Sequence, residues 1–211
     1  MYAKYFKRVI DFTLALIALI VLSPLFIILT IAGAVAMGGN PFFVQERPGK
    51  DEKIFSLIKF RTMNNKRGED GELLPDTVRL NKYGRFLRST SCDELPSLVN
   101  VLMGDLSLIG PRPLAVQYLP FFTETERKRH SVRPGLTGLA QANGRNGLSW
   151  DKKFEYDIAY VENLTFAMDA KIFLKTIKVV LTRQNIGIRG EDGLIDFDVY
   201  RKRRWEDANV N

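Results

Sequence analysis

The stretch GRFLRSTSCDELPSLVNVLMGDLSLIGPRP, residues 84–113, carries the strongest structural signals in this chain of 211 residues. Ser91 and Glu94 have the spacing of a capping box, which predicts that a helix begins near Ser91–Asp93. Apolar residues follow at helical spacing and Gly104 is expected to end the helix: Leu95, Leu98, Val99 and Leu102. The helix therefore begins with two adjacent acids, Asp93 and Glu94.

These adjacent acids have an ordinary and a chemical interpretation. Acids in a first helical turn complement the helix dipole and need no further role. They can also bind a divalent cation or attack phosphorus. The surrounding cations bring the chemical interpretation level with the ordinary one, because arginine forks bind phosphate and two acids need few partners. The surplus would suit a polyanion such as a nucleoside diphosphate and comprises these cations: Lys59, Arg61, Arg85, Arg88, Arg112 and Arg145.

Arg112 lies between Pro111 and Pro113. Two fixed φ angles stiffen the backbone, so Arg112 would lose little entropy on binding a ligand. An ordinary proline turn with a solvated arginine is the alternative. The chain has no glycine-rich phosphate loop and no CxxC or HExxH motif, so carboxylates and Mg²⁺, or Mn²⁺, are the expected metal chemistry.

Residues 12–37 contain no charged side chain, and as a straight helix they would measure about 39 Å. That length would span a bilayer, but Ser23-Pro24 interrupts the run at its middle and predicts a break. Basic residues flank both ends, and basic flanks prefer the cytoplasmic side. A re-entrant helix–break–helix satisfies both flanks, whereas a spanning helix satisfies one. A cleaved signal peptide is the third possibility, although the run is long for an h-region.

Composition sets wider limits. The hydrophobic fraction of 45% suffices for a core in one domain, and the net charge of +7 suits nucleic acid, anionic lipid or phosphate-bearing substrates. The single cysteine, Cys92, excludes an intramolecular disulfide and fits a reducing compartment. Acids flank this thiol, which disfavours a nucleophilic role. His130 lies in a basic run and is expected at the surface.

The remaining pattern predicts a mainly helical α+β fold. Residues 41–50 are expected to form a turn-rich exit from the membrane and 54–63 a short strand, with a polar loop over 64–75 and loop or short strands over 131–149. Helices are predicted over 115–129, 152–163 and 170–183. The expected divisions are a membrane helix over 1–40, a membrane-associated core over 41–185 and a basic tail over 186–211. The tail is expected to contact anionic lipid.

Three ordered motifs resemble one family. They are KFRTM at 59–63, the stretch 84–113 and RPGLTGLAQANGR at 133–145, followed by Asp157, Tyr160 and Asp169. Together they resemble the bacterial sugar transferases, the monotopic phosphoglycosyl transferases, over about residues 1–183. The chain is similar to the minimal form of that family, with interfacial amphipathic helices beside a re-entrant membrane helix. Cys92 departs from the aliphatic residue more common there.

The resemblance implies transfer of a sugar-1-phosphate from a UDP-sugar to polyprenyl (undecaprenyl) phosphate, with release of UMP. It implies that Asp93 attacks phosphorus to form a covalent phosphosugar-enzyme, while Glu94 assists the Mg²⁺ site. An N-acetylated deoxyamino sugar such as diacetylbacillosamine is the expected sugar. The expected place is the bacterial inner membrane, with the site on the cytoplasmic face. The resemblance implies substrate or phosphate contacts for Lys59, Arg61, Arg88, Arg112, Arg145, Asp157 and Asp169.

Two other hypotheses stay open at the level of sequence. Direct transfer in a ternary complex would use the same groups, with Asp93 and Glu94 binding only the metal. A membrane-tethered module that binds nucleic acid or a protein partner would use the positive charge and would not need Asp93. The chain has no continuous basic stripe, so we expect no nucleic-acid partner. The sequence predicts no oligomeric state.

Overall fold

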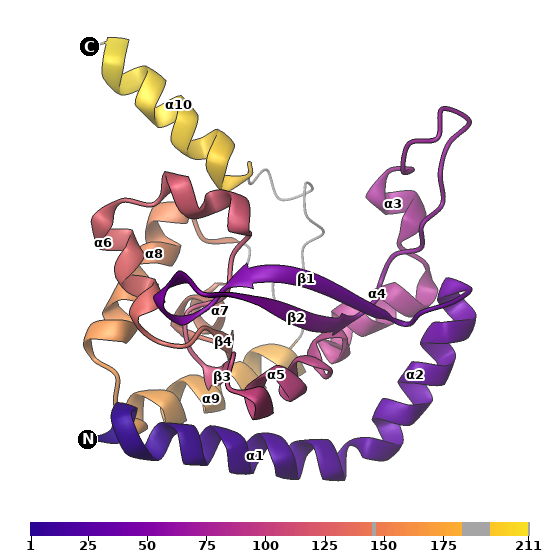
Figure 1. Cartoon of the computed structure of the whole chain (residues 1–211), viewed down its shortest axis with the longest axis horizontal. Coiled ribbons are helices and arrows are strands. Elements are labelled where there is room, and N and C mark those ends of the chain that lie inside the picture. Colours follow the sequence, from indigo (N-terminus) through magenta and orange to yellow (C-terminus); the bar gives the residue numbers. More distant parts are fainter. Residues whose placement is uncertain (145–146, 183–194, 211) are drawn as a thin grey trace.

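The computed structural model describes residues 1–144, 147–182 and 195–210. Helices dominate, and two small two-stranded sheets lie among them, so the predicted α+β class is confirmed (Figure 1). The central hairpin crosses the middle of the molecule, and the N-terminal helices run along one side of it in the view of Figure 1.

The N-terminus forms two helices that meet at an angle. A short π-helix, η1 (Tyr2–Phe6), continues into α1 (Lys7–Val21), and α2 (Ser23–Met37) follows after Leu22. Pro24 lies in the first turn of α2, where its missing N–H costs no helical hydrogen bond. The predicted break at Ser23-Pro24 is therefore present, with a bend of 66°. Within the described residues, no single helix is long and apolar enough to cross a membrane. The two helices of this bent pair have the required length and apolar composition only when they are taken together.

Polar contacts attach α1 to the rest of the fold. Lys7 is buried and its Nζ donates to Oδ2 of Asp169 at 2.7 Å, while Asp11 accepts from the Ser107 hydroxyl at 2.6 Å. Arg8 donates to the carbonyl oxygens of Val101 and Leu102, at the C-terminal end of helix α5 (Ser97–Met103). Each contact satisfies a group that burial would otherwise leave unpaired. One face of α1 is therefore bound to protein.

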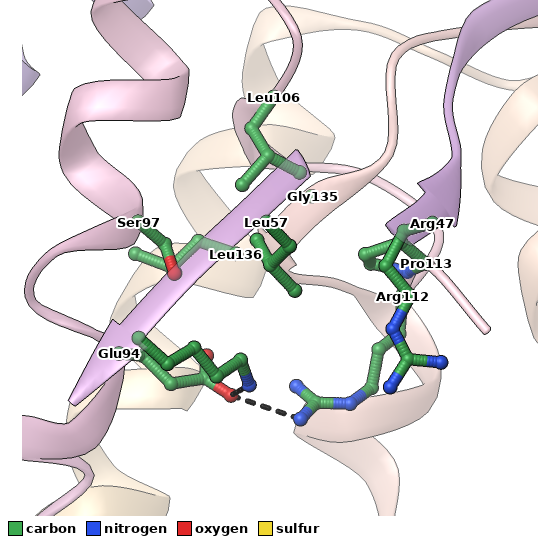
Figure 2. A pocket seen from close by; sticks show the side chains of 10 residues that line it. Arg47, Leu57, Glu94, Ser97, Leu106, Arg112, Pro113, Gly135 and Leu136 are labelled. Atoms are coloured by element: carbon green, nitrogen blue, oxygen red, sulfur yellow. Dashed lines mark hydrogen bonds and ion pairs between the residues drawn. The ribbon is translucent and has the colours of Figure 1, made fainter. Parts of the chain in front are cut away.

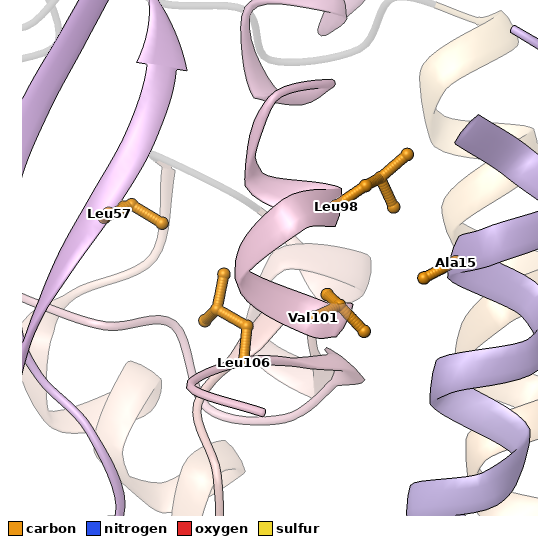
Figure 3. Close-up of a cluster of buried hydrophobic side chains, with 5 residues drawn as sticks. All are labelled: Ala15, Leu57, Leu98, Val101 and Leu106. Atoms are coloured by element: carbon orange, nitrogen blue, oxygen red, sulfur yellow. The ribbon is translucent and has the colours of Figure 1, made fainter. Parts of the chain in front are cut away.

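The first hydrophobic cluster joins α1, α5 and the hairpin. Ala15 of α1 packs against Leu98 and Val101 of α5, and Leu57 and Leu106 complete the cluster (Figure 3). The opposite apolar face of the helix pair remains exposed, at Ile17, Ile20, Val21, Ile28, Ile31 and Val35 among others. Such a continuous apolar face is typical of a surface that contacts lipid or a partner.

The segment predicted as a turn-rich exit is instead the first strand of a hairpin. Strand β1 (Phe42–Pro48) pairs antiparallel with β2 (Ile54–Phe60), from Phe42 opposite Phe60 to Pro48 opposite Ile54. A 3-10 turn, η2 (Lys50–Glu52), connects them. The polar and proline residues of β1 give it a low strand propensity, so its sequence did not predict a strand. Pairing with β2 stabilises β1 instead. The strand predicted over 54–63 is confirmed but ends at Phe60.

The stretch 84–113 contains parts of two helices, which corrects the prediction of a single helix that begins near Ser91. Helix α4 (Lys82–Thr90) follows the short α3 (Asp76–Arg79), and α5 begins at Ser97. Ser91 has φ +57° and ends α4 without a side-chain cap bond, so the predicted capping box is absent. The acids lie in a 3-10 turn between the helices, η3 (Cys92–Glu94). Gly104, at φ +95°, ends α5 as predicted.

The second sheet is a short parallel pair, β3 (Ser107–Ile109) and β4 (Gly135–Thr137). Gly110, the residue after β3, lies very close to the start of β4. A Cβ on Gly135 would lie 2.0 Å from the Gly110 nitrogen. Glycine is therefore required at this contact, and it brings the segment after β3 against β4.

The remaining helices enclose this sheet. The helix predicted over 115–129 is three short pieces, η4 (Val116–Phe121), α6 (Glu124–Arg127) and η5 (Lys128–Ser131), because Pro120 and the Thr123 cap interrupt it. Helix α7 (Leu139–Asn143) lies within the predicted loop. The helices α8 (Trp150–Glu162) and α9 (Phe166–Leu181) confirm the two later predictions.

The C-terminal helix α10 (Phe197–Val210) packs on an aromatic cluster. Phe197 is fully buried among Tyr118, Phe122 and Phe154. Arg201 is buried and ion-paired with Glu126. The predicted lipid contact is therefore wrong for Arg201, because a carboxylate inside the protein binds its guanidinium. In Figure 1, α10 lies at the opposite end of the molecule from α1.

Candidate active site

Glu94 is the centre of a cluster that joins three distant segments. Its Oε1 accepts from Lys59 Nζ at 2.7 Å and from Arg112 Nη2 at 2.8 Å (Figure 2). Lys59 comes from β2 and Glu94 from η3, while Arg112 follows β3. The structure therefore brings together three of the residues that the sequence predicts for the site.

The charges around Glu94 favour its ionised form. Burial alone would raise its pKa, but Arg112 and Lys59 outweigh that effect and lower the pKa to about 2. Glu94 in turn raises the pKa of Arg112. Glu94 is therefore a fixed anion at neutral pH and keeps two cations at one place.

Asp93 has the opposite electrostatic behaviour. Burial and then the neighbouring Glu94 raise its pKa, although Lys59, Arg112 and Arg88 oppose the shift. Within the described residues, no hydrogen bond to the Asp93 carboxylate is observed. A half-buried carboxylate beside cations, without a bonded partner, is suited to nucleophilic attack or to metal binding.

Two further predicted arginines, Arg88 and Arg61, lie on α4 and directly after β2. Arg88 Nε donates to the Thr62 hydroxyl at 3.2 Å, which places its guanidinium between α4 and the end of β2. Its charge acts on Asp93. Arg61 directly follows β2, and its backbone N–H donates to the Pro41 carbonyl at 2.7 Å. Arg88 thus belongs to the cluster, while phosphate binding by either arginine stays a prediction.

The Pro-Arg-Pro segment is supported by hydrogen bonds as well as by its prolines. The buried Pro111 accepts from the Gly135 N–H at 2.9 Å, and the Arg112 carbonyl accepts from Arg129 Nη2 at 2.6 Å. The Arg112 side chain remains 46% exposed. The first two residues of the segment are therefore bonded to neighbours through their carbonyls, while the guanidinium can reach a ligand.

Asp157, predicted to contact substrate, lies behind this segment. It is 3% exposed and accepts from both Nε and Nη2 of Arg129, at 3.0 and 2.8 Å. Because Arg129 also bonds the Arg112 carbonyl, Asp157 supports the arginine loop from inside the fold. These contacts suit a positioning role, and the predicted substrate contact of Asp157 stays a prediction.

Asp169 has a similar internal position. Its carboxylate accepts from Lys7 Nζ, from the Tyr160 hydroxyl at 2.8 Å and from the Tyr2 hydroxyl at 2.7 Å. These contacts join α9 to the N-terminal helix, and the predicted substrate or phosphate contact of Asp169 stays a prediction. Arg145 lies outside the described residues, and its predicted role stays a prediction.

Three residues differ from expectation or were not predicted for the site. His130 is buried beside Glu52 and Arg129, and burial lowers its pKa to about 4, so the surface placement was wrong. Arg129 belongs to the basic run 127–130 that contains His130, and nothing in that run predicts that Arg129 is buried. Arg47, one of the basic residues that follow the apolar run 12–37, was not predicted for the site and lines the cavity beside Glu94.

That cavity has a volume of about 40 Å³ and is lined by Arg47, Lys59, Glu94, Ser97, Arg112, Pro113 and apolar neighbours (Figure 2). Within the described residues, no group of three or more His, Cys, Asp or Glu side chains could bind a metal by itself. Two adjacent carboxylates nevertheless fit Mg²⁺, which commonly uses one or two protein carboxylates together with substrate phosphates and water. The donor set therefore fits a metal that arrives with a phosphate-bearing ligand.

The chain matches a family model described as bacterial sugar transferase over residues 2–183. The chain belongs to this family. The match includes β2, η3 and the Pro-Arg-Pro segment, so every member of the Glu94 cluster lies inside it. The resemblance seen in the sequence is thereby confirmed at the level of the family.

Relatives with descriptive names support the assignment. An uncharacterized sugar transferase, EpsL, of Bacillus subtilis is 52% identical over 85% of this chain and 89% of its own length. A Klebsiella pneumoniae UDP-glucose:undecaprenyl-phosphate glucose-1-phosphate transferase is 37% identical over 82% of this chain and 39% of its own length. A Salmonella typhimurium undecaprenyl-phosphate galactose phosphotransferase is 36% identical, over 86% and 41%. This chain thus spans about two fifths of the latter two proteins.

Proposed function

We propose that this bacterial sugar transferase moves a sugar-1-phosphate from a UDP-sugar to polyprenyl phosphate, giving polyprenyl-diphosphate-sugar and UMP. The observation that carries the proposal is the Glu94 cluster, with an available Asp93 beside it. A nucleoside diphosphate needs cations for its phosphates, and Lys59, Arg88 and Arg112 supply them around one carboxylate pair. The names of the relatives from Klebsiella and Salmonella support the same reaction class.

In the first step, an ionised Asp93 oxygen attacks the β-phosphorus of the UDP-sugar. A new O–P bond forms, and the bond between the β-phosphorus and the oxygen bridging to the α-phosphate breaks. That oxygen leaves with UMP, and the sugar phosphate remains on Asp93. Arg112 and Lys59 neutralise charge that develops on the phosphates, because both cations already converge on this point.

In the second step, a phosphate oxygen of polyprenyl phosphate attacks the same phosphorus. The Asp93–phosphorus bond breaks, and the carboxylate is regenerated. Glu94, which is anionic at neutral pH, can accept a hydrogen bond from the incoming phosphate, while its own partners restrict its position. The two steps allow one compact site to receive the donor and the acceptor in turn.

Asp93 and Glu94 are the residues that would bind Mg²⁺, or Mn²⁺, together with the diphosphate oxygens. A bound divalent cation would neutralise negative charge on the leaving UMP. Removal of divalent ions with a chelator is therefore expected to stop turnover.

We place this chemistry at the cytoplasmic face of the bacterial inner membrane. The bent helix pair exposes a wide apolar face, and basic residues flank both of its ends. A re-entrant pair would keep both flanks in the cytosol, where UDP-sugars are found, and would bring the site to the lipid acceptor. The exposed Phe166, Phe173 and Leu174 give α9 an apolar face that fits an interfacial helix.

Intact-protein mass spectrometry tests the proposal directly. The full chain in detergent, with Mg²⁺ and a UDP-sugar but no lipid acceptor, is expected to gain the mass of one sugar phosphate. The donor panel includes the N-acetylated deoxyamino sugar that the resemblance favours, with glucose and galactose from the names of relatives. The adduct should be absent in Asp93→Asn and present in Cys92→Ala, which removes the only thiol.

The same experiment separates the covalent and direct routes. Some donors could give no adduct and no exchange of labelled UMP into UDP-sugar. Turnover of such a donor with polyprenyl phosphate would favour direct transfer. Normal turnover by Asp93→Asn would refute the nucleophilic role outright.

A further inference from the structure

A second and larger cavity lies away from the Glu94 cluster, beside the start of α1. Its volume is about 270 Å³, against about 40 Å³ for the cavity at Glu94. Five segments supply its lining, which comprises Ala3, Lys4, Lys7, Asp11, Lys50, Ser107, Ser131, Val132, Arg133 and Leu164. The reaction proposed above uses none of these residues.

The polar lining of this cavity is mostly cationic. Lys7 is neutralised, because it contacts Asp169 at 2.7 Å and Asp11 at 3.7 Å. Asp11 is likewise occupied by Lys7 and by the Ser107 hydroxyl. Lys4 and Lys50 are exposed, and the ion pair that Lys50 makes among the described residues is a long contact of 3.9 Å with Asp51. The cavity therefore has positive charge that its own acid does not balance.

Arg133 adds a directed cation to the same wall. Its Nε donates to the Gly104 carbonyl at 2.8 Å, which orients the guanidinium, and in the described part of the chain its two terminal nitrogens have no hydrogen-bond acceptor. An oriented guanidinium with two nearby ammonium groups is suited to a phosphate, whose oxygens accept several charge-assisted hydrogen bonds. The apolar members Ala3, Val132 and Leu164 would contact a less polar part of the same ligand.

Exposed aromatic residues mark the same end of the molecule. Tyr5 and Phe6 are 59% and 56% exposed, and Phe166, whose ring packs edge-on against Tyr2, is 59% exposed. Aromatic residues beside basic ones are typical of the headgroup level of a membrane. The exposed Val9 and Phe12 continue from this point along α1.

We propose that this cavity binds the headgroup phosphate of an anionic glycerophospholipid, at the point where the N-terminal helix enters the membrane. The proposal rests on the membrane placement given under the proposed function. Lys4, Lys50 and Arg133 bind the phosphate, and the apolar wall contacts the glycerol and the first part of the acyl chains. Basic pockets beside membrane helices commonly recognise lipid headgroups in this way. The bound lipid would anchor the N-terminal helix without occupying the catalytic cavity.

Native mass spectrometry of the full chain in mild detergent tests this site. The probe is dioctanoylphosphatidylglycerol, compared with dioctanoylphosphatidylcholine and with inorganic phosphate. We expect one retained phosphatidylglycerol, with binding about tenfold weaker in the double variant Lys4→Glu/Lys50→Glu. The matched control Lys66→Glu/Lys82→Glu changes the charge equally at exposed lysines outside the cavity and should bind within about twofold of wild type.

Several outcomes would overturn the proposal. Equal lipid binding by wild type and the Lys4/Lys50 variant would exclude the cavity as the binding site. An equal loss of lipid binding in the Lys66/Lys82 control would show that only overall charge matters. Binding of inorganic phosphate alone would identify a soluble anion as the ligand. Displacement of phosphatidylglycerol by polyprenyl phosphate, weakened by the same variant, would make the cavity an acceptor site.

The binding measurement needs no donor and no turnover, so its failure is distinguishable from failure of the proposed function. The sugar-phosphate adduct is measured separately on the same two variants. Loss of lipid binding with a normal adduct supports a separate lipid site. Normal lipid binding with turnover but without any adduct in wild type would instead refute the covalent route.

Discussion

At the scale of single residues, two neighbouring acids differ because of what each side chain contacts. Glu94 bonds Lys59 and Arg112, and its pKa falls to about 2. Asp93 shares the field of these cations without bonding them, and burial raises its pKa above the ordinary 3.8. Environments that separate the pKa values of paired acids commonly mark different chemical roles. Glu94 organises the cations, and Asp93 is left available for chemistry.

This difference predicts how the adduct rate depends on pH. Attack requires ionised Asp93, so the rate should fall as pH decreases through its raised pKa, while Glu94 stays charged. Glu94→Gln removes the neighbouring negative charge and leaves Lys59 and Arg112 facing Asp93 alone. The pKa of Asp93 should then fall, moving the acid limb about one pH unit lower, although the maximum rate also falls.

Adduct formation followed by mass spectrometry across the acid range measures this limb. The control Glu69→Gln removes an exposed acid from the 64–75 loop and should leave the limb in place. An acid limb that stays fixed or moves upward in Glu94→Gln would contradict the proposed coupling.

At the scale of elements, close backbone contact places α4 against the end of β2. A Cβ on Gly84 would lie 1.9 Å from the Thr62 carbonyl oxygen, so only glycine permits this approach. Arg88, one turn further along α4, bonds the Thr62 hydroxyl. The small residue in the helix therefore helps to set the position of a cation beside Asp93.

Gly84→Ala is expected to destabilise the protein by about 1–3 kcal/mol, because the added methyl forces α4 away from Thr62. Helix propensity alone predicts the opposite sign, since alanine favours a helix over glycine by about 1 kcal/mol. Equilibrium unfolding in detergent measures the difference, and the adduct rate should fall as Arg88 moves.

Gly39→Ala is the matched control, because no atom lies within 4 Å of a Cβ added there. If Gly84→Ala proved as stable as this control, the close contact between α4 and Thr62 would carry no energetic weight.

At the scale of the whole molecule, the bent helix pair is bound to the core along its length. The Tyr83 hydroxyl donates to the Leu29 carbonyl at 2.8 Å, and Asn81 Nδ2 donates to the Ala36 carbonyl at 3.1 Å. Lys7 joins the other end of the pair to Asp169. These contacts favour the bent arrangement over one straight helix, and they connect α2 directly to α4.

A re-entrant arrangement predicts that both ends of the pair lie on one side of the membrane. Single cysteines at Ala3→Cys and Asp51→Cys, each in a Cys92→Ala background, should resist an impermeant maleimide in intact bacterial cells. Both should react after the cells are permeabilised, which controls for accessibility. Labelling of position 3 alone in intact cells would show a spanning helix.

Local features allowed part of the fold and site to be predicted. Short-range sequence patterns predicted the break at Ser23-Pro24, the end of α5 at Gly104 and the helices α8 and α9. The structure confirms all of them. Strand β1 was missed because its pairing with β2 supplies the stability that its composition lacks. The proposed divisions at residues 40 and 185 stay predictions.

The sequence by itself determined the acid pair, the stiffened arginine, the broken apolar run and the family resemblance, because each is a property of neighbouring residues. Only the tertiary structure decided which cations bond Glu94, since Lys59 and Arg112 lie 35 and 18 positions away. It likewise decided that Asp157 and Asp169 face cations inside the fold. A buried charge requires a partner, and only chain folding brings that partner within bonding distance.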